Sequence, residues 1–183
     1  MKKVLLATAA TALFSGTAFA QATDTVEMTV SASVAQECSV EQPDNVNFGQ
    51  LAINQDPGEE ALLLTQGRIS DYQDIWISCN YGANMALAAT SMVNQDQAND
   101  GPDAADFSDT IPYRMELNNS AGVNSTVFNR MSFDTLTNSG DNKTNTDAFH
   151  DQASLLLRYV PRPDLRPLAG NYLGTASITV GGV

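Results

Sequence analysis

The chain has 183 residues, of which 9 are basic and 21 are acidic, so its formal net charge at pH 7 is −12. Such an acidic chain lacks the basic surface that nucleic acid binding requires, and we expect no nucleic acid partner. The length suits one domain with a well-formed core. After the first residues, no segment approaches 20 consecutive apolar residues, so we expect no membrane-spanning helix.

Residues 1–20 have the pattern of a bacterial signal peptide. Lys2 and Lys3 precede a short apolar run, and the segment ends in Ala18-Phe19-Ala20, which is typical of a cleavage site. A retained membrane anchor is the alternative, but the apolar run is too short to span a bilayer. Cleavage after Ala20 would remove two lysines and make the exported chain still more acidic. We therefore expect a protein that is exported through the periplasm.

The next predicted element is a strand over residues 25–34, where apolar and polar residues alternate strictly. Its apolar face consists of Val26, Met28, Val30, Ala32 and Val34. A period of two residues predicts a half-buried β-strand. A strand this near the N-terminus must pair with a sheet edge, either in its own domain or in a neighbouring molecule.

The sequence contains two cysteines, Cys38 and Cys79, and one histidine, His150. In an exported protein, one disulfide between the cysteines is the expected arrangement. It would contribute roughly 4 kcal/mol in the chain-entropy model. The alternative is a redox or metal-binding pair, which the wide spacing and the lack of a cysteine–histidine cluster disfavour. We expect His150 to be an exposed histidine in a polar segment, and we expect no metal site and no cofactor.

The rest of the chain predicts short strands that are separated by polar loops. The strands are expected at residues 75–79, 85–89, 111–117, 127–133, 154–160 and 171–180. Their inward positions are Ile75, Ile77, Cys79, Met85, Leu87, Tyr113, Met115, Leu117, Tyr172, Ala176, Ile178 and Val180. Polar loops are expected at residues 94–109 and 138–147, and one or two turns of helix at residues 59–66. Many short strands with turn signals between them predict an all-β sandwich.

The sequence does not favour an enzyme. It has one histidine, no G-x-S-x-G nucleophile elbow, and carboxylates that lie in loops without positional logic. We therefore expect no catalytic residues.

Several motifs, taken in order, resemble the spore coat protein U domain, which is shared by subunits of archaic chaperone–usher pili. The resemblance covers nearly the whole exported chain. It rests on Cys38-Ser39-Val40, Val46-Asn47-Phe48-Gly49, Ile77-Ser78-Cys79, Ile111-Pro112-Tyr113-Arg114-Met115 and Leu168-Ala169-Gly170-Asn171-Tyr172.

The resemblance implies an incomplete immunoglobulin-like β-sandwich over residues 35–183, preceded by a donor segment at residues 21–34. In such pilins the donor strand of the next subunit completes the fold. A periplasmic chaperone and an outer-membrane usher are the implied partners during assembly. The implied roles are the donor strand for Val26, Met28, Val30 and Ala32; the family disulfide for Cys38 and Cys79; family motif positions for Phe48, Gly49, Gly170 and Tyr172; and the last strand, beside the acceptor groove, for Ile178 and Val180.

The function expected from this resemblance is that of a structural subunit of a surface pilus that serves adhesion or biofilm formation. A head-to-tail contact between donor and groove builds open filaments. Two alternatives stay open: a secreted or coat protein that completes its own sandwich, and an extracellular ligand-binding module for a cation or a glycan. One departure from the family is Gly181-Gly182, because two glycines weaken a strand.

Overall fold

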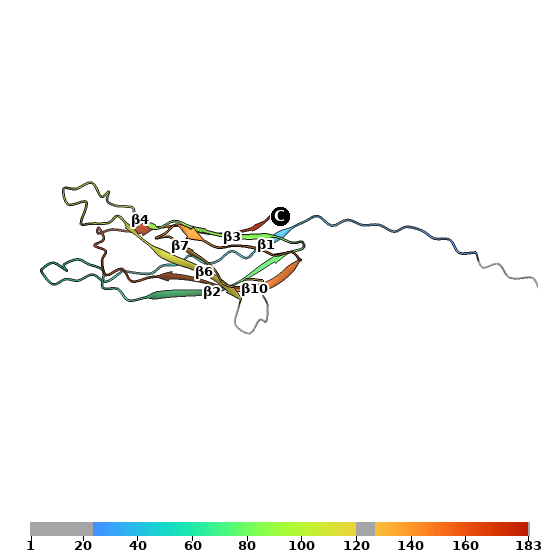
Figure 1. Cartoon of the computed structure of the whole chain (residues 1–183), viewed down its shortest axis with the longest axis horizontal. Coiled ribbons are helices and arrows are strands. Elements are labelled where there is room, and N and C mark those ends of the chain that lie inside the picture. Colours follow the sequence, from blue (N-terminus) through green and yellow to red (C-terminus); the bar gives the residue numbers. More distant parts are fainter. Residues whose placement is uncertain (1–23, 120–126, 183) are drawn as a thin grey trace, which may run out of the picture. The chain divides into compact units, whose positions relative to one another are not determined.

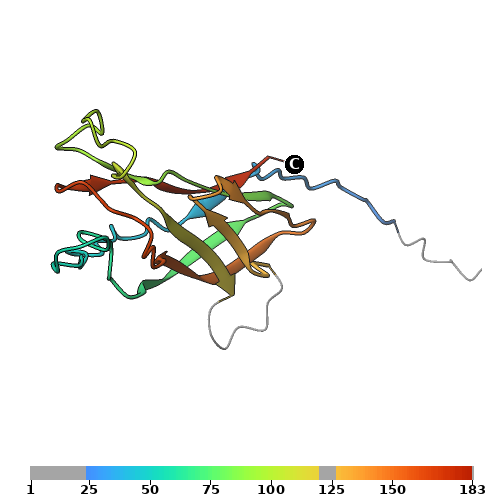
Figure 2. The same cartoon turned by 60° about the vertical axis from the view of Figure 1, so that its left-hand side comes forward.

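A computed structural model describes residues 24–119 and 127–182 (Figures 1 and 2), so the predicted signal peptide lies outside the described residues. The described chain is all-β: it contains no helix, and every pairing between its strands is antiparallel. Within these residues there is accordingly no helix of the length and apolarity that crossing a membrane requires. The chain divides into two units, residues 1–34 and residues 35–183.

The largest sheet of the second unit has six strands. Its order is β1 (Cys38–Val40), β2 (Ile69–Cys79), β10 (Phe149–Tyr159), β6 (Tyr113–Asn119), β7 (Met131–Asp134) and β8 (Ser139–Gly140). Strands β2 and β10 pair along all of their 11 residues, from Cys79 opposite Phe149 to Ile69 opposite Tyr159. Strand β10 therefore lies inside the sheet, between β2 and β6.

Two smaller sheets have three strands each. One has the order β12 (Ala176–Gly181), β3 (Asn84–Ala89) and β9 (Asn142–Thr144). The other has the order β11 (Tyr172–Leu173), β4 (Met92–Asn94) and β5 (Thr110–Ile111). Strand β12 pairs with β3 along its whole length, from Ala176 opposite Ala89 to Gly181 opposite Asn84. Among the described strands β12 pairs with no other, so it is an edge strand.

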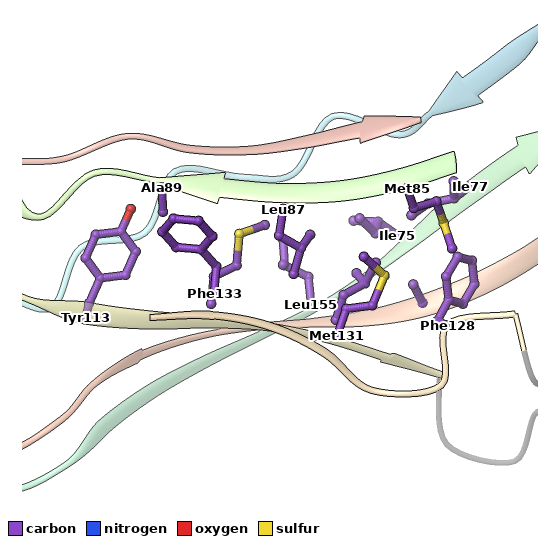
Figure 3. Packing of buried hydrophobic residues seen from close by; sticks show 13 residues of the cluster. Ile75, Ile77, Met85, Leu87, Ala89, Tyr113, Phe128, Met131, Phe133 and Leu155 are labelled. Carbon is purple, nitrogen blue, oxygen red and sulfur yellow. The ribbon is translucent and has the colours of Figure 1, made fainter. Parts of the chain in front are cut away.

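The core lies between the six-stranded sheet and β3 (Figure 3). Its members come from β2, β3, β6, β7 and β10: Ile75, Ile77, Met85, Leu87, Ala89, Tyr113, Met115, Leu117, Met131, Phe133, Ala153 and Leu155, joined by Phe128. The alternation read from the sequence is confirmed here, because Ile75, Met85 and Met115 all point inward as expected. A second, smaller cluster packs Leu64, Ile111 and Tyr159 together.

Several predicted boundaries were wrong. The expected polar loop at residues 138–147 contains β8 and β9, and the expected helix at residues 59–66 is a turn followed by a bridge from Ile53 to Leu64. Strand β10 begins at Phe149, so His150 lies in a strand. The predicted strand at 111–117 is divided by Pro112, which has no N–H to donate to a ladder.

The predicted strand at residues 25–34 forms no strand in the described part of the chain. A β-strand needs a neighbour to satisfy its backbone N–H and C=O groups, and an alternating sequence alone does not supply one. No strand pairing in the described structure therefore accounts for the alternation at residues 25–34.

Candidate functional site

A groove of about 630 Å³ opens between the edge strand β12 and the chain segment that follows β1. Its floor belongs to the core, with Met115 and Leu155 buried to 1% exposure. Half-buried apolar residues border the floor: Val40, Phe48, Met92, Leu157 and Ile178. The rim is polar and carries Glu41, Gln42, Asp44, Asn45 and Ser177. The groove therefore has an apolar floor and a polar border, and it lies beside a strand edge.

The first wall is the segment over residues 41–48, which leaves the sheet just after β1. The ladder with β2 ends at Glu41, whose N–H donates to the Trp76 carbonyl (2.9 Å) and whose carboxylate accepts from the Trp76 N–H (2.9 Å). Pro43 follows and cannot donate to a ladder. The chain therefore departs from β2 at this point.

The side chain of Gln73 holds this departing segment in place. Its Oε1 accepts from the Asp44 N–H (2.8 Å) and its Nε2 donates to the Asp44 carbonyl (3.1 Å), as a paired strand residue would. A third bond, from Nε2 to the Asp71 carboxylate (3.0 Å), fixes the amide orientation. One side chain thus replaces the missing stretch of backbone ladder along this wall.

The second wall is β12. Ala176, Ser177 and Ile178 line the groove, and Gly174 precedes them. Val180 packs against the core but does not line the groove. The C-terminal end of β12 lies beside β1 (Figures 1 and 2). The two walls therefore approach each other at that end and separate toward Gly174.

Tyr113 fixes the start of β12 above the floor. Its ring is 5% exposed, and its hydroxyl donates to the Thr175 carbonyl (2.7 Å). Burial raises the pKa of the Tyr113 hydroxyl to about 12. The group is therefore a neutral donor at any physiological pH, and it ties the second wall to β6.

The motif residues lie at the ends of the groove. The Phe48 ring is 6.3 Å from that of Tyr113 and packs against both core clusters. Gly49 follows with a φ of 71°, and its N–H donates to the Asn47 side chain (2.8 Å), which forms a tight turn. Phe48 thus packs at the edge of the core, and Gly49 supplies the left-handed backbone of the bend that follows it.

Gly170 and Tyr172 fasten the loop at residues 95–109. Gly170 has a φ of 142°, and a Cβ there would lie 2.8 Å from the Asn94 side chain, so only glycine fits. The Tyr172 hydroxyl donates to the Leu168 carbonyl (2.8 Å), and the ring lines the groove. Burial raises the pKa of the Tyr172 hydroxyl. These two positions are structural, and Tyr172 also shapes the site.

The disulfide between Cys38 and Cys79 is confirmed, with an S–S distance of 2.03 Å. It joins β1 to the end of β2. Next to it, Asn80 donates to the Ala35 carbonyl (2.7 Å) and accepts from the Glu37 N–H (2.9 Å). The chain just before β1 is therefore fastened to β2, both covalently and by hydrogen bonds.

The predicted donor residues lie in the first unit, which is described here by itself. Val26, Met28 and Val30 are 82%, 82% and 88% exposed, and Ala32 is exposed as well. Single exposed apolar residues are ordinary on protein surfaces. A regular row of large ones along an unpaired segment is not, because such rows mark interaction sites.

The described residues contain no group of three or more metal-ligating side chains. His150 bonds through Nδ1 to the Ser78 hydroxyl (2.6 Å) and stacks on Trp76. Its surroundings are thus an aromatic ring and a hydroxyl, on the outer face of the six-stranded sheet.

The sequence reasoning did not find Gln73 or the segment over residues 41–48 as parts of the site. Gln73 occupies an inward position of β2, by the alternation that buries Ile75 and Ile77. A polar residue at such a position is a signal that a buried or bordering backbone group needs a partner. The sequence therefore shows that Gln73 needs a partner, but it does not indicate that the partner is Asp44, 29 residues away.

No model of a known protein family matches this chain, and no curated protein matches it either.

Proposed function

We propose that this protein is a structural subunit of a bacterial surface filament, and that subunits join head to tail by donor-strand exchange. In this proposal the fold is an immunoglobulin-like sandwich that lacks one strand. The observation that carries the proposal is a match within one chain. An apolar groove lies beside the unpaired edge of β12, and residues 25–34 present a regular apolar row with no strand partner.

The chemistry of the two parts is complementary. A strand added at a sheet edge gains affinity from main-chain hydrogen bonds, while side chains entering pockets set its register. Every second residue of the donor segment would enter the groove. Burial of Val26, Met28 and Val30 contributes roughly 5–9 kcal/mol gross, from about 1.5–3 kcal/mol for each side chain. The polar alternates, Glu27 and Thr29, would then face water.

The segment that joins donor and domain supports exchange between molecules over self-completion. Residues 33–37 contain no Gly, Pro, Asn or Asp, and Ser33 is their one residue of a type common in turns. Ala35 and Glu37 are also bonded to Asn80, so the chain enters β1 in a fixed direction. On these grounds we expect the donor to fill the groove of another copy.

Such a contact between different surfaces leaves one donor and one groove open at the two ends of any assembly, so it builds an open filament. An empty groove leaves the apolar residues of its border only half-buried before assembly. The proposal therefore includes a periplasmic chaperone that covers the groove and an outer-membrane usher that supports the exchange. The filament would serve adhesion or biofilm formation at the cell surface.

The proposal is tested with a truncated protein that begins at Ala35 and a synthetic peptide of residues 24–34. We expect the peptide to bind and to raise the melting temperature. At a peptide concentration of 100 times Kd, the added stability is about 2.7 kcal/mol. A peptide with Met28 and Val30 replaced by Ser should not bind. A matched peptide with Glu27 and Thr29 replaced by Ser should bind as the natural one does.

A groove variant provides the complementary control. Ala176 is exposed and lines the groove, whereas Thr179 is exposed on the same strand outside it. We expect Ala176→Lys to abolish peptide binding and filament formation, and Thr179→Lys to leave both intact. Equal binding of all peptides would contradict the proposal. So would a full-length exported chain that stays monomeric at high concentration and melts at the temperature of the peptide-bound truncated protein, because it would then have completed its own sheet.

A further inference from the structure

The outer face of the six-stranded sheet carries an exposed aromatic row away from the groove. Tyr72 is 69% exposed and Trp76 is 44% exposed, and both point outward from β2. His150, on the neighbouring strand β10, completes the row. We call these three residues, together with the polar residues between them, the aromatic face.

Trp76 is held rigidly. Its ring stacks on that of His150 with centroids 4.7 Å apart and an interplanar angle of 12°. His150 is itself fixed by the 2.6 Å hydrogen bond between its Nδ1 and the Ser78 hydroxyl. The stack covers one face of the Trp76 ring and holds the ring in place, while Trp76 stays 44% exposed. Little side-chain entropy is therefore lost when a ligand binds it.

Polar groups surround the two aromatic positions on the same face. The register places Gln152 opposite Trp76 and Ser154 opposite Asp74, and Asn118 lies next to Ser154 on β6. Tyr72 and Trp76 are four residues apart along one strand, or roughly 13 Å at the usual rise. Hydroxyl and amide groups thus lie between two ring surfaces.

Charged side chains elsewhere on the outer face of the six-stranded sheet pair with one another. Arg114 pairs with Asp134 at 2.6 Å, and the buried carboxylate of Glu116 pairs with Arg158 and, at 3.7 Å, with Arg130. The face therefore offers no excess of positive charge to a phosphate, a sulfate or a nucleic acid, and the chain as a whole is acidic. Charge complementarity therefore disfavours an anionic ligand.

A protein partner fits this face poorly. A stable protein interface buries about 800 Å² on each side around an apolar centre, and its centre is depleted in charged residues. Here the two aromatic rings are separated by a polar row that contains Asp74. A second copy of the chain would bury those polar groups without compensating apolar area.

We propose that the aromatic face binds a neutral oligosaccharide. The faces of a sugar ring present C–H groups, which carry partial positive charge and are attracted to the negative face of an aromatic ring. The hydroxyls at the sugar's edge match the amide and hydroxyl side chains between Tyr72 and Trp76. The distance between the two rings requires more than one sugar unit to cover both. This site is independent of the groove, so it stands or falls separately from donor-strand exchange.

Trp76 is the only tryptophan of the chain and reports directly on this face. The test is a fluorescence titration of the full exported chain with three neutral probes: cellohexaose, maltohexaose and chitohexaose. We expect a saturable change in emission with at least one hexasaccharide, and weaker binding of its monosaccharide. The variant Tyr72→Ala should weaken binding about five- to tenfold, the effect of losing one aromatic contact. Leu136→Ala, which changes another exposed residue (58%) on the turn after β7, is the matched control and should bind normally.

The proposal is overturned if none of the three probes produces a saturable change in emission up to about 10 mM, a concentration that would nearly saturate a site with a Kd of about 1 mM. It is also overturned if Tyr72→Ala binds as tightly as the natural protein. An emission change that follows protein concentration without any sugar would overturn it too, because a second copy would then cover the aromatic face.

Discussion

Glu116 allows the electrostatics of the main sheet to be tested quantitatively. Its side chain is 6% exposed, between Arg158, whose side chain is 16% exposed, and the exposed Arg130. Arg158 also lies directly opposite Arg114 on β6. Replacing Glu116 by Gln would remove the carboxylate that pairs with Arg158. Of the two neighbouring arginines, Arg114 would still pair with Asp134, the only other carboxylate that pairs with either of them in the described structure.

The expected loss follows from the burial of this pair. Breaking a fully buried ion pair costs about 3–5 kcal/mol, because a charge is left uncompensated. Arg158 keeps partial contact with solvent, so we expect Glu116→Gln to lower the free energy of unfolding by about 2–3 kcal/mol. Asp164→Asn is the matched control: it removes the partner of Arg162 at a site where the Asp164 side chain is 65% exposed. Its loss should lie between about 0 and 1 kcal/mol.

Urea unfolding, followed by Trp76 fluorescence and by circular dichroism, measures both changes. The midpoint for Glu116→Gln should fall by about 1 M or more with an unchanged slope. A double variant, Glu116→Leu with Arg158→Met, should recover most of the stability, because apolar replacement of both partners removes the uncompensated charge. The reasoning is refuted if Glu116→Gln unfolds at the same midpoint as Asp164→Asn, or if the double variant is less stable than the single one.

Three further predictions concern other parts of the domain. Reduction of the disulfide should lower the free energy of unfolding by up to roughly 4 kcal/mol in the chain-entropy model, measurable by urea unfolding with and without reductant. Gly170→Ala should destabilise by about 1–3 kcal/mol, because its Cβ would meet Asn94, whereas Gly49→Ala, with open space around it, should cost about 1 kcal/mol; thermal melts compare them. Stability should fall at both pH extremes. The pKa of Asp164 is lowered to about 2 by its bond to the neighbouring arginine, so its contribution is present above about pH 4 and is lost as the pH falls toward 2; Asp164→Asn should flatten that limb of the profile. The raised pKa of Tyr113, about 12, makes its contribution complete below pH 10 and lost as the pH rises above it, so Tyr113→Phe should flatten the alkaline limb.

Much of the core could be predicted from period-two alternation. Ile75, Met85 and Met115 were assigned inward from the sequence, and they are buried as expected. This succeeds because one face of each of these strands is sealed by the opposite layer, which forces a strict apolar pattern.

Strands without a sealed apolar face escaped the same reasoning. Strand β9 reads Asn142-Lys143-Thr144 and contains no apolar residue; it forms because the edge of β3 is available to it. The first half of β2 has the inward residues Asp71 and Gln73, which no hydrophobic pattern reveals. These residues face the departing segment after β1, so their polarity follows from a long-range contact that sequence alone does not disclose.

The segment at residues 25–34 shows the reverse case. Its alternation at residues 25–34 is among the clearest in the sequence, yet the described chain forms no strand there. A pattern reports which residues could be buried together, and the partner that buries them need not belong to the same molecule. The groove, in contrast, could not be predicted from the sequence, because its two walls are formed by residues near the two ends of the sequence of this unit.

The amide of Gln73 has a consequence for the specificity of assembly. Because it occupies both main-chain groups of Asp44, the wall at residues 41–48 offers a newcomer no hydrogen bonds at that residue. If subunits assemble as proposed, an added strand could not pair with the main chain at Asp44, which favours pairing with β12. The Gln73 side chain would thus reduce unwanted strand pairing at this wall, while the edge of β12 stays available for pairing.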